Sequence, residues 1–202
     1  MIVIGLTGGS GSGKGCVCKS FLRYGIPAID TDKTSREVCT KGKPCLNELV
    51  ASFGDSILYE DGTLNRAALA SIAFSDSDKL AVLNRITHYH ILNEVRVWLD
   101  AQRQQGCRAA IVDAPLLFES GFDKECDVIV TVTAPREERI DRLLLRDGIT
   151  RDAIELRLSK QHPDEFYTER SDFTITNSGS LEELNAQADL IYRKLFSNII
   201  TE

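Results

Sequence analysis

The residues with the clearest chemical potential form a glycine-rich loop near the start of the chain. Residues 8–15 read GGSGSGKG and follow the apolar run IVIGL, with only Thr7 between them. Gly8, Gly13 and Lys14 have the spacing of a phosphate-binding loop, G-x-x-x-x-G-K-[ST], in which glycines let backbone N–H groups turn toward phosphates. Gly15 stands where this pattern has a hydroxyl that binds Mg²⁺. The stretch therefore predicts a nucleotide site with one metal ligand replaced.

Two alternatives to a phosphate loop are a plain Gly/Ser-rich turn and a dinucleotide-binding loop. A strand is predicted before the loop and a helix is predicted to begin near Lys14, and this context disfavours the plain turn. A lysine directly after the last glycine disfavours the dinucleotide-binding loop. We expect Lys14 to bridge the β- and γ-phosphates and to offset charge during phosphoryl transfer.

Carboxylates follow two other predicted strands. Asp113 ends the strand AAIVD and is expected to hold Mg²⁺ through water, with a turn or helix-cap role as the alternative. Asp32 is expected to end the strand that begins near residue 27, where it would orient an acceptor hydroxyl and accept its proton. Asp30 competes for this role because it lies two residues earlier, on the same face. Asp32 is preferred because it lies nearer the open edge.

A series of arginines follows the fourth predicted strand. Arg139, Arg142 and Arg146 have i, i+3, i+7 spacing and share one face of a predicted helix. A solvated face that pairs with neighbouring acidic residues is the alternative. The position after the strand favours a mobile lid whose guanidinium groups clamp the transferred phosphoryl group, with Arg142 and Arg146 foremost. The whole series comprises Arg136, Arg139, Arg142, Arg146, Arg151 and Arg157.

Short apolar runs alternate with segments of helical period, which predicts a parallel sheet flanked by helices. Five such runs are found, and several end in polar residues at the edge where α/β proteins bind ligands. Residues 36–105 have little strand character and predict a separate helical lobe. His88 and His90 lie two apart on its long helix and face different directions, so they do not predict a zinc pair.

Composition sets further limits. The 202 residues carry a net charge of −6, which argues against general nucleic-acid binding, and no apolar run approaches the length of a membrane span. There is no sign of a signal peptide. The six cysteines are scattered, which favours reduced thiols. Cys16 and Cys18 would point about 200° apart on a helix, which is poor geometry for a shared metal.

Together these segments resemble the dephospho-CoA kinase family, P-loop kinases of the last step of coenzyme A synthesis. The resemblance covers nearly the whole chain. It is carried by IGLTGGSGSGKG, GIPAIDTDKTSREV, FGDSILYEDGTLNRAALASIAF, LNRITH, VDAPLLFESGF, RLLLRDGITRDAIELRLSKQ and SDFTITNSGSLEEL. It implies an α/β P-loop kinase core with a five-stranded parallel sheet at residues 1–35 and 106–202, a lid at about 136–165, and a CoA-binding helical lobe at 36–105.

The resemblance also implies the reaction and the site. ATP and Mg²⁺ would be used to phosphorylate the ribose 3′-hydroxyl of dephospho-CoA, with Asp32, Lys14, Arg142 and Arg146 in catalytic roles. The acceptor would contact Asp32, Arg36, Arg66, His88, Leu117 and Glu119, and Asp113 would hold the metal through water. The ATP site would comprise Gly8, Gly9, Ser10, Gly11, Ser12, Gly13, Lys14, Gly15, Cys16, Arg142 and Asn177, with Asn177 near the adenine. The expected enzyme is cytoplasmic, a monomer or weak homo-oligomer, and binds neither nucleic acid nor membrane.

Two departures from the family pattern stand out. The family reads GKST where this chain has Lys14-Gly15-Cys16, and HP where it has His88-Tyr89, which leaves the helix unbroken. We expect Mg²⁺ binding to persist, because the ion keeps several waters and takes ligands from the substrate's phosphates. The alternatives are another P-loop small-molecule or nucleoside kinase and a nucleotide-binding protein that has lost catalysis. A signalling GTPase is disfavoured by the lack of an N-K-x-D element.

Overall fold

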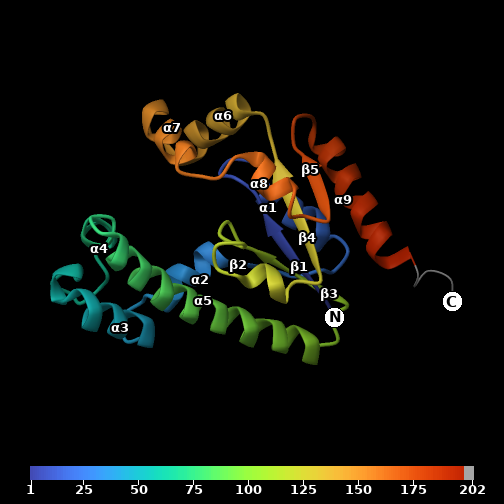
Figure 1. The fold of residues 1–202 in the computed structure, drawn as a ribbon. Coiled ribbons are helices and arrows are strands. Elements are labelled where there is room, and N and C mark those ends of the chain that lie inside the picture. Colours follow the sequence, from blue (N-terminus) through green and yellow to red (C-terminus); the bar gives the residue numbers. More distant parts are fainter. Residues whose placement is uncertain (198–202) are drawn as a thin grey trace. The chain divides into compact units, whose positions relative to one another are not determined.

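The computed structural model describes residues 1–197, in which five strands form one sheet. The strand order is β2-β3-β1-β4-β5, and β1 pairs in parallel with both β3 and β4, as β4 does with β5. The predicted α/β class with a five-stranded parallel sheet is confirmed. The strands, labelled in Figure 1, are β1 (Ile2–Thr7), β2 (Ala28–Asp30), β3 (Ala109–Asp113), β4 (Val128–Thr133) and β5 (Phe173–Thr176).

Helices make up most of the remaining described chain. The helix α5 runs without a break through His88 and Tyr89, as predicted. Within residues 1–197 no helix combines the length and apolar character needed to cross a membrane. The α-helices are α1 (Lys14–Leu22), α2 (Thr31–Val38), α3 (Pro44–Phe53), α4 (Arg66–Ala73), α5 (Ser77–Gln104), α6 (Arg136–Asp147), α7 (Arg151–Ser159), α8 (Asp164–Thr168) and α9 (Leu181–Phe196), with short 3₁₀ helices at Asp55–Ile57 and Phe122–Glu125.

The chain divides into two compact units. The sheet unit comprises Met1–Ile29 and the residues from Gln102 onward, and the helical unit comprises Asp30–Ala101. Each boundary lies a few residues before the one expected from the sequence. The phosphate loop, Asp113 and the arginine series belong to the sheet unit, whereas Asp32, Arg66 and His88 belong to the helical unit.

The core of the sheet unit forms where one face of the sheet packs against α1 and α9. Ile4 and Leu6 of β1 lie in this core with Val17 and Phe21 of α1, and none of the four is more than 1% exposed. Side chains alternate between the faces of a strand, so Gly5 faces the other side. There a Cβ on Gly5 would lie 2.8 Å from Sγ of Cys126 and 2.9 Å from Cδ2 of Leu117. The loop after β3 therefore packs directly on the backbone of β1.

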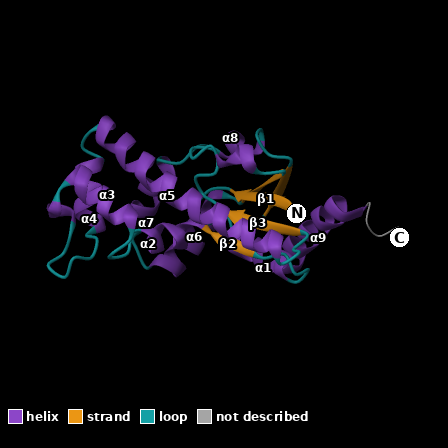
Figure 2. Ribbon diagram, turned by 90° about the horizontal axis from the view of Figure 1, so that it is seen from below, coloured by secondary structure: helices purple, strands orange, loops and turns teal. Residues whose placement is uncertain are grey.

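The helical unit has its own apolar core. Leu49 of α3, Ile57, Leu69 of α4 and Ile86 of α5 pack together and are at most 6% exposed. Figure 2 shows α3 and α4 gathered beside α5. Asn65 caps α4, because its side-chain oxygen accepts the Ala68 N–H at 3.1 Å. The unit thus holds its helices through burial and caps of its own.

The close packing at Gly5 predicts a stability effect. Gly5→Ala should lower the free energy of unfolding by about 1–3 kcal/mol, because the added Cβ overpacks Leu117 and Cys126. Gly15→Ala is the matched control: nothing lies within 4 Å of its Cβ position, and alanine favours the helix. Urea unfolding of both variants measures the difference. Equal stability of wild type and Gly5→Ala would contradict the packing described for this strand.

Candidate active site

The loop between β1 and α1 has the backbone of a phosphate loop. Gly8, Gly11 and Gly13 have φ angles of 132°, 78° and 101°, a region that favours glycine. The helix α1 begins at Lys14, as predicted, so its positive dipole end lies at the loop. All three glycines also lack room for a side chain. A Cβ on Gly8 would overlap the Val132 carbonyl group, and a Cβ on Gly13 would overlap Nδ2 of Asn177.

Each of the six carbonyl oxygens from Gly8 to Gly13 accepts a hydrogen bond. A loop that binds an anion must direct its carbonyl oxygens away from the anion, because only its N–H groups attract negative charge. The carbonyl oxygens that point away from the anion therefore need hydrogen-bond donors outside the anion site. The oxygens accept, in order, from Lys14 Nζ (2.8 Å), Ser12 N (3.3 Å), Arg139 Nε (2.9 Å), Arg142 Nη1 (3.3 Å), Asn177 Nδ2 (2.7 Å) and Cys16 N (2.9 Å).

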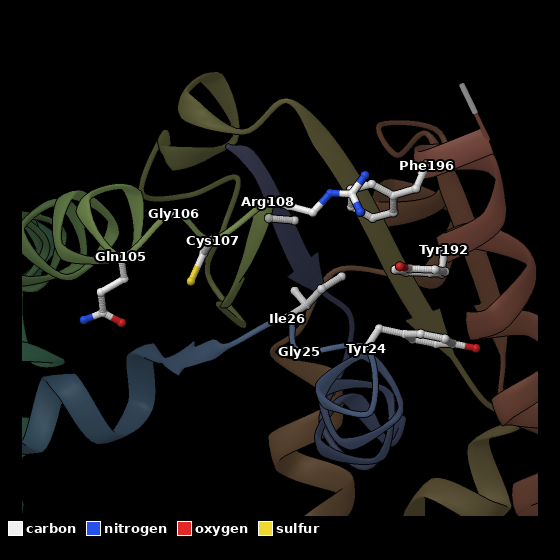
Figure 3. A pocket seen from close by; sticks show the side chains of 10 residues that line it. Tyr24, Gly25, Ile26, Gln105, Gly106, Cys107, Arg108, Tyr192 and Phe196 are labelled. Carbon is white, nitrogen blue, oxygen red and sulfur yellow. The ribbon is translucent and has the colours of Figure 1, made fainter. Parts of the chain in front are cut away.

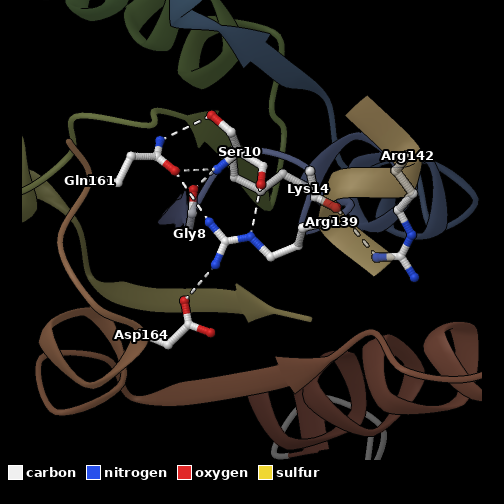
Figure 4. A network of polar contacts seen from close by, with 8 residues as sticks. Gly8, Ser10, Lys14, Arg139, Arg142, Gln161 and Asp164 are labelled. Carbon is white, nitrogen blue, oxygen red and sulfur yellow. Dashed lines mark hydrogen bonds and ion pairs between the residues drawn. The ribbon is translucent and has the colours of Figure 1, made fainter. Parts of the chain in front are cut away.

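Arg139 and Gln161 hold the loop at Ser10, as Figure 4 shows. Arg139 Nε donates to the Ser10 carbonyl oxygen, Nη1 pairs with Asp164 at 3.1 Å and Nη2 donates to Gln161 Oε1 at 3.2 Å. The same Gln161 oxygen accepts the Ser10 N–H at 3.0 Å, and Gln161 Nε2 donates to Ser10 Oγ at 3.0 Å. Arg139 lies so close that a Cβ on Gly9 would overlap its guanidinium group.

The structure changes the ranking within the arginine series. Arg142 lies at the loop, where it also donates to the Asn177 carbonyl oxygen at 3.0 Å and pairs with Glu138 at 2.7 Å. Arg139, which the sequence analysis ranked lower, is only 8% exposed and also donates to the loop, at the Ser10 carbonyl oxygen. Arg146 instead pairs with Asp147 at 2.7 Å, and its side chain is 63% exposed. A role for Arg146 on bound ATP stays a prediction.

The pairing at the end of α6 affects one carboxyl group. Hydrogen bonds from Arg146 and then from Arg157, at 2.6 Å, lower the pKa of Asp147 to about 2. Asp147 therefore stays ionised at neutral pH and ties the last residues of α6 to α7. Both contacts of Asp147 are made with residues of α6 and α7.

Asp113 ends β3 as predicted, and in the sheet register it lies opposite Leu6 of β1. Its Oδ2 accepts a weak hydrogen bond from Sγ of Cys18 on α1, at 3.8 Å. Gly15 is exposed and nothing lies within 4 Å of its Cβ position. The donor set is thus the Asp113 carboxylate, and the chain has open space at Gly15, where the family pattern has a hydroxyl. It fits a hydrated Mg²⁺ ion, which binds through one or two carboxylates and several waters.

The environment of Asp30 and Asp32 corrects one prediction. The strand β2 ends at Asp30, and Asp32 lies in the first turn of α2 instead of ending the strand. The reason is a helix cap that the sequence analysis did not identify: Asp30 accepts the N–H groups of Asp32 at 2.9 Å and Lys33 at 3.1 Å. This cap engages the Asp30 carboxylate with the backbone, whereas the Asp32 side chain is exposed.

The structure brings some predicted acceptor residues together within the helical unit. Arg36 lies in the last turn of α2, and Arg66, the first residue of α4, donates to the carbonyl oxygen of Ser35 at 3.5 Å. Arg36 and Arg66 are both exposed. His88 is half-buried in the middle of α5. Their contact with substrate stays a prediction.

Two buried thiols lie close to Arg66. Cys39 and Cys45 have their sulfur atoms 3.6 Å apart. The hydrogen bond from Cys45, aided by the charge of Arg66, lowers the pKa of Cys39 to about 7. The same interaction raises the pKa of Cys45, because the two sulfurs share one proton. Spacing along the chain does not indicate this pair, since the cysteines show no C-x-x-C motif.

The two predicted residues of the DAPLLFE segment have different environments. The Leu117 side chain is completely buried against Gly5, so it packs in the core and offers no surface to a substrate. Glu119 is exposed, and its Oε1 lies 3.5 Å from Nε2 of His162. Asn177 follows β5, and its side-chain amide is occupied by the Ser12 carbonyl oxygen. Its expected adenine contact stays a prediction.

A cavity of about 260 Å³ lies elsewhere in the sheet unit. Figure 3 shows Tyr24, Tyr192, Phe196 and Arg108 around it, and the turns before β2 and β3 complete its lining. These turns precede their strands, so the cavity lies at the amino edge of the sheet. The phosphate loop and Asp113 follow their strands, which places them at the carboxyl edge, where α/β folds bind ligands. The cavity is therefore separate from the candidate site.

Comparisons with known proteins show which family the chain is similar to. A sequence model of the dephospho-CoA kinase family matches residues 2–183. A dephospho-CoA kinase of Corynebacterium glutamicum is 39% identical, over 98% of this chain and 100% of its own length. The crystal structure of a Thermus thermophilus protein has a TM-score of 0.81 and 30% identity, over 96% of this chain and 97% of that one. A dephospho-CoA kinase from Campylobacter jejuni shares the fold, with a TM-score of 0.70 and 21% identity over 97% and 98%.

The family model and the curated relative each span most of the chain, and the sheet order and phosphate loop are those of an ATP-dependent kinase. The chain belongs to the dephospho-CoA kinase family.

Proposed function

We propose that this enzyme transfers the γ-phosphoryl group of ATP to the ribose 3′-hydroxyl of dephospho-CoA, giving ADP and CoA. The observation that carries the proposal is the complete phosphate loop, with each carbonyl from Gly8 to Gly13 hydrogen-bonded, in a chain that the family model matches over residues 2–183. Phosphoryl transfer depends mainly on positioning and on charge stabilisation, and this loop supplies both.

At the phosphate end, the roles follow from position. The loop amides and the first turn of α1 bind the β- and γ-phosphates. Lys14, whose ammonium group lies at the Gly8 carbonyl oxygen, exchanges that contact for the phosphates. Arg142 lies beside Gly11 and stabilises the charge of the transferred group. Asp113 would hold Mg²⁺ through water, and the bound ion would neutralise part of the phosphate charge.

At the acceptor end, Asp32 is the proposed general base for the 3′-hydroxyl. Its carboxylate is exposed at the start of α2, whereas that of Asp30 is engaged in capping the same helix. Arg66 donates to the carbonyl oxygen of Ser35, the residue before Arg36, so the contact brings Arg66 to the segment that carries Arg36. Arg36 and Arg66 supply positive charge for the phosphates of the acceptor. His88 and Glu119 are assigned to the acceptor on the family resemblance alone.

The choice of acceptor is the most direct test of the proposal. Release of ADP, followed in a coupled assay, should require dephospho-CoA, and the product should carry its new phosphate on the 3′-oxygen. Uridine and adenosine are the matched controls for another small-molecule kinase. Phosphorylation of a nucleoside in preference to dephospho-CoA would contradict the proposal. ATP binding without phosphorylation of any of these acceptors would favour a protein that has lost catalysis.

Removal of the proposed base should reduce chemistry more than binding. Asp32→Asn should lower kcat by about 10²–10⁴-fold, because general-base assistance is lost while the side chain keeps its size. Asp30→Asn, which alters the capping side chain, is the control and should change stability by at most about 2 kcal/mol. Both variants are compared by steady-state kinetics. Equal kcat for wild type and Asp32→Asn would remove Asp32 from this role.

The open place at Gly15 predicts a metal effect. Gly15→Ser should fit without a clash, because nothing lies within 4 Å of the Cβ position. The new hydroxyl can replace a water on Mg²⁺, so the Mg²⁺ concentration for half-maximal rate should fall. Gly15→Ala provides the Cβ without the hydroxyl and should leave that concentration unchanged. Titration of the rate with Mg²⁺ decides, and identical behaviour of the serine and alanine variants would contradict the prediction.

A further inference from the structure

All the polar groups of Ser10 are bound by two side chains from outside the loop. Its N–H and its hydroxyl go to Gln161, and its carbonyl oxygen goes to Arg139, at distances of 2.9–3.0 Å. Gln161 lies between α7 and α8 and is separated from Ser10 by 151 positions in the chain. Figure 4 shows the side chains of Gln161 and Arg139 directed toward Ser10. The first half of the loop is thus anchored by a segment remote in sequence.

These bonds determine which backbone N–H groups of the loop can still donate to a bound anion. The Ser10 N–H is used by Gln161, and the Ser12 N–H is directed to the Gly9 carbonyl oxygen at 3.3 Å. A backbone N–H donates one strong hydrogen bond, so an amide held by a side chain is withdrawn from the phosphates. Gln161 therefore acts on the phosphate site through the conformation of Ser10.

We propose that Gln161 is a positioning residue for ATP binding, which holds Ser10 so that the phosphate loop keeps its open, anion-binding conformation before ATP arrives. The proposal rests on the use of ATP proposed above. Gln161 does not contact the reacting atoms. It lowers the cost of ordering the loop, so its removal weakens ATP binding without a matching loss of chemistry once ATP is bound.

The chemistry of the side chain explains why glutamine suits this position. One end must accept from both the Ser10 N–H and the guanidinium group of Arg139, and the other end must donate to the Ser10 hydroxyl. Only an amide offers both an acceptor oxygen and a donor nitrogen at the end of a chain of this length. Glutamate lacks the donor, and leucine or methionine would leave the Ser10 N–H without this acceptor.

Arg139 and Asp164 complete the arrangement. Arg139 is 8% exposed and would be costly to bury without charged and polar partners. Asp164 pairs with its Nη1 at 3.1 Å, which fixes the guanidinium plane so that Nε reaches Ser10 and Nη2 reaches Gln161. The loop, α6 and the segment before α8 are thereby joined in a single polar cluster. Gln161 is its only uncharged side chain with bonds to both Ser10 and Arg139 among residues 1–197.

The test measures ATP binding and catalysis separately. Gln161→Ala should raise the dissociation constant for ATP by about tenfold, consistent with the loss of net hydrogen bonds to the loop. Its kcat at saturating ATP should fall by less than about threefold, and its KM for dephospho-CoA should not change, since that acceptor does not contact Ser10 in this account. An unchanged dissociation constant for ATP would overturn the proposal, as would a loss confined to kcat.

A double-mutant cycle identifies the route through Ser10. Ser10→Ala removes the hydroxyl that Gln161 Nε2 contacts, and should weaken ATP binding by about threefold. In the Gln161→Ala background, the same Ser10→Ala change should have no further effect, because its partner is already absent. Effects that multiply would show that the two side chains act independently and would overturn the proposed route. Ser10→Ala also keeps the test available if Gln161→Ala does not fold.

Gln102→Ala is the matched control. Gln102 is another largely buried glutamine of the sheet unit, where its Oε1 accepts from Sγ of Cys107 at 3.6 Å, just before β3 and thus at the opposite edge of the sheet. Gln102→Ala should lower the midpoint temperature of thermal unfolding and leave the dissociation constant for ATP unchanged. Weakened ATP binding by Gln102→Ala equal to that of Gln161→Ala would mean a general structural effect. If wild type itself does not bind ATP, the proposed function fails, whereas normal binding by wild type and Gln161→Ala alike overturns only this inference.

Discussion

An anion can rest on backbone amides only where the neighbouring carbonyl oxygens are held away from it. In this protein that condition is met by three side chains from distant elements. Arg139, Arg142 and Asn177 donate to the successive carbonyl oxygens of residues 10–12. Glycine restricts the backbone least, so without these donors the loop could adopt other backbone conformations as easily as this one. The strands and helices of the sheet unit position these donor side chains at the loop.

The framework also explains why certain positions carry no side chain. Gly9 lies against the guanidinium group of Arg139, and Gly13 lies against the amide of Asn177, so a Cβ at either position would overlap the donor that holds the loop. Gly15 differs from both, because the space beside it is open. Its lack of a side chain serves no packing need. If Mg²⁺ binds as proposed, the missing hydroxyl would change its coordination, and the loop remains intact around Gly15.

Local features of the sequence predicted much of this arrangement, and long-range contacts account for what it missed. The start of α1 at Lys14 and the five strands follow from short-range patterns, so they were predicted correctly. The polar residues that follow the apolar run at 27–29 suggested a strand end at Asp32, but the cap made by Asp30 begins the helix at Thr31. Helical period put Arg139 and Arg146 on one face, yet only the fold decides which of them reaches the loop. Gln161 has no local signal, because its partner Ser10 is 151 positions away.

We infer that hydrogen bonds from side chains outside the loop give it its conformation before any phosphate binds. A crystal structure of the protein with ADP and Mg²⁺ would show whether these bonds persist. We expect the Ser10 N–H still to donate to Gln161, and Arg139 and Asn177 still to donate to the carbonyl oxygens of Ser10 and Ser12. The phosphates should lie on the amides around Lys14. A phosphate oxygen on the Ser10 N–H, with Gln161 turned away from the loop, would contradict this inference.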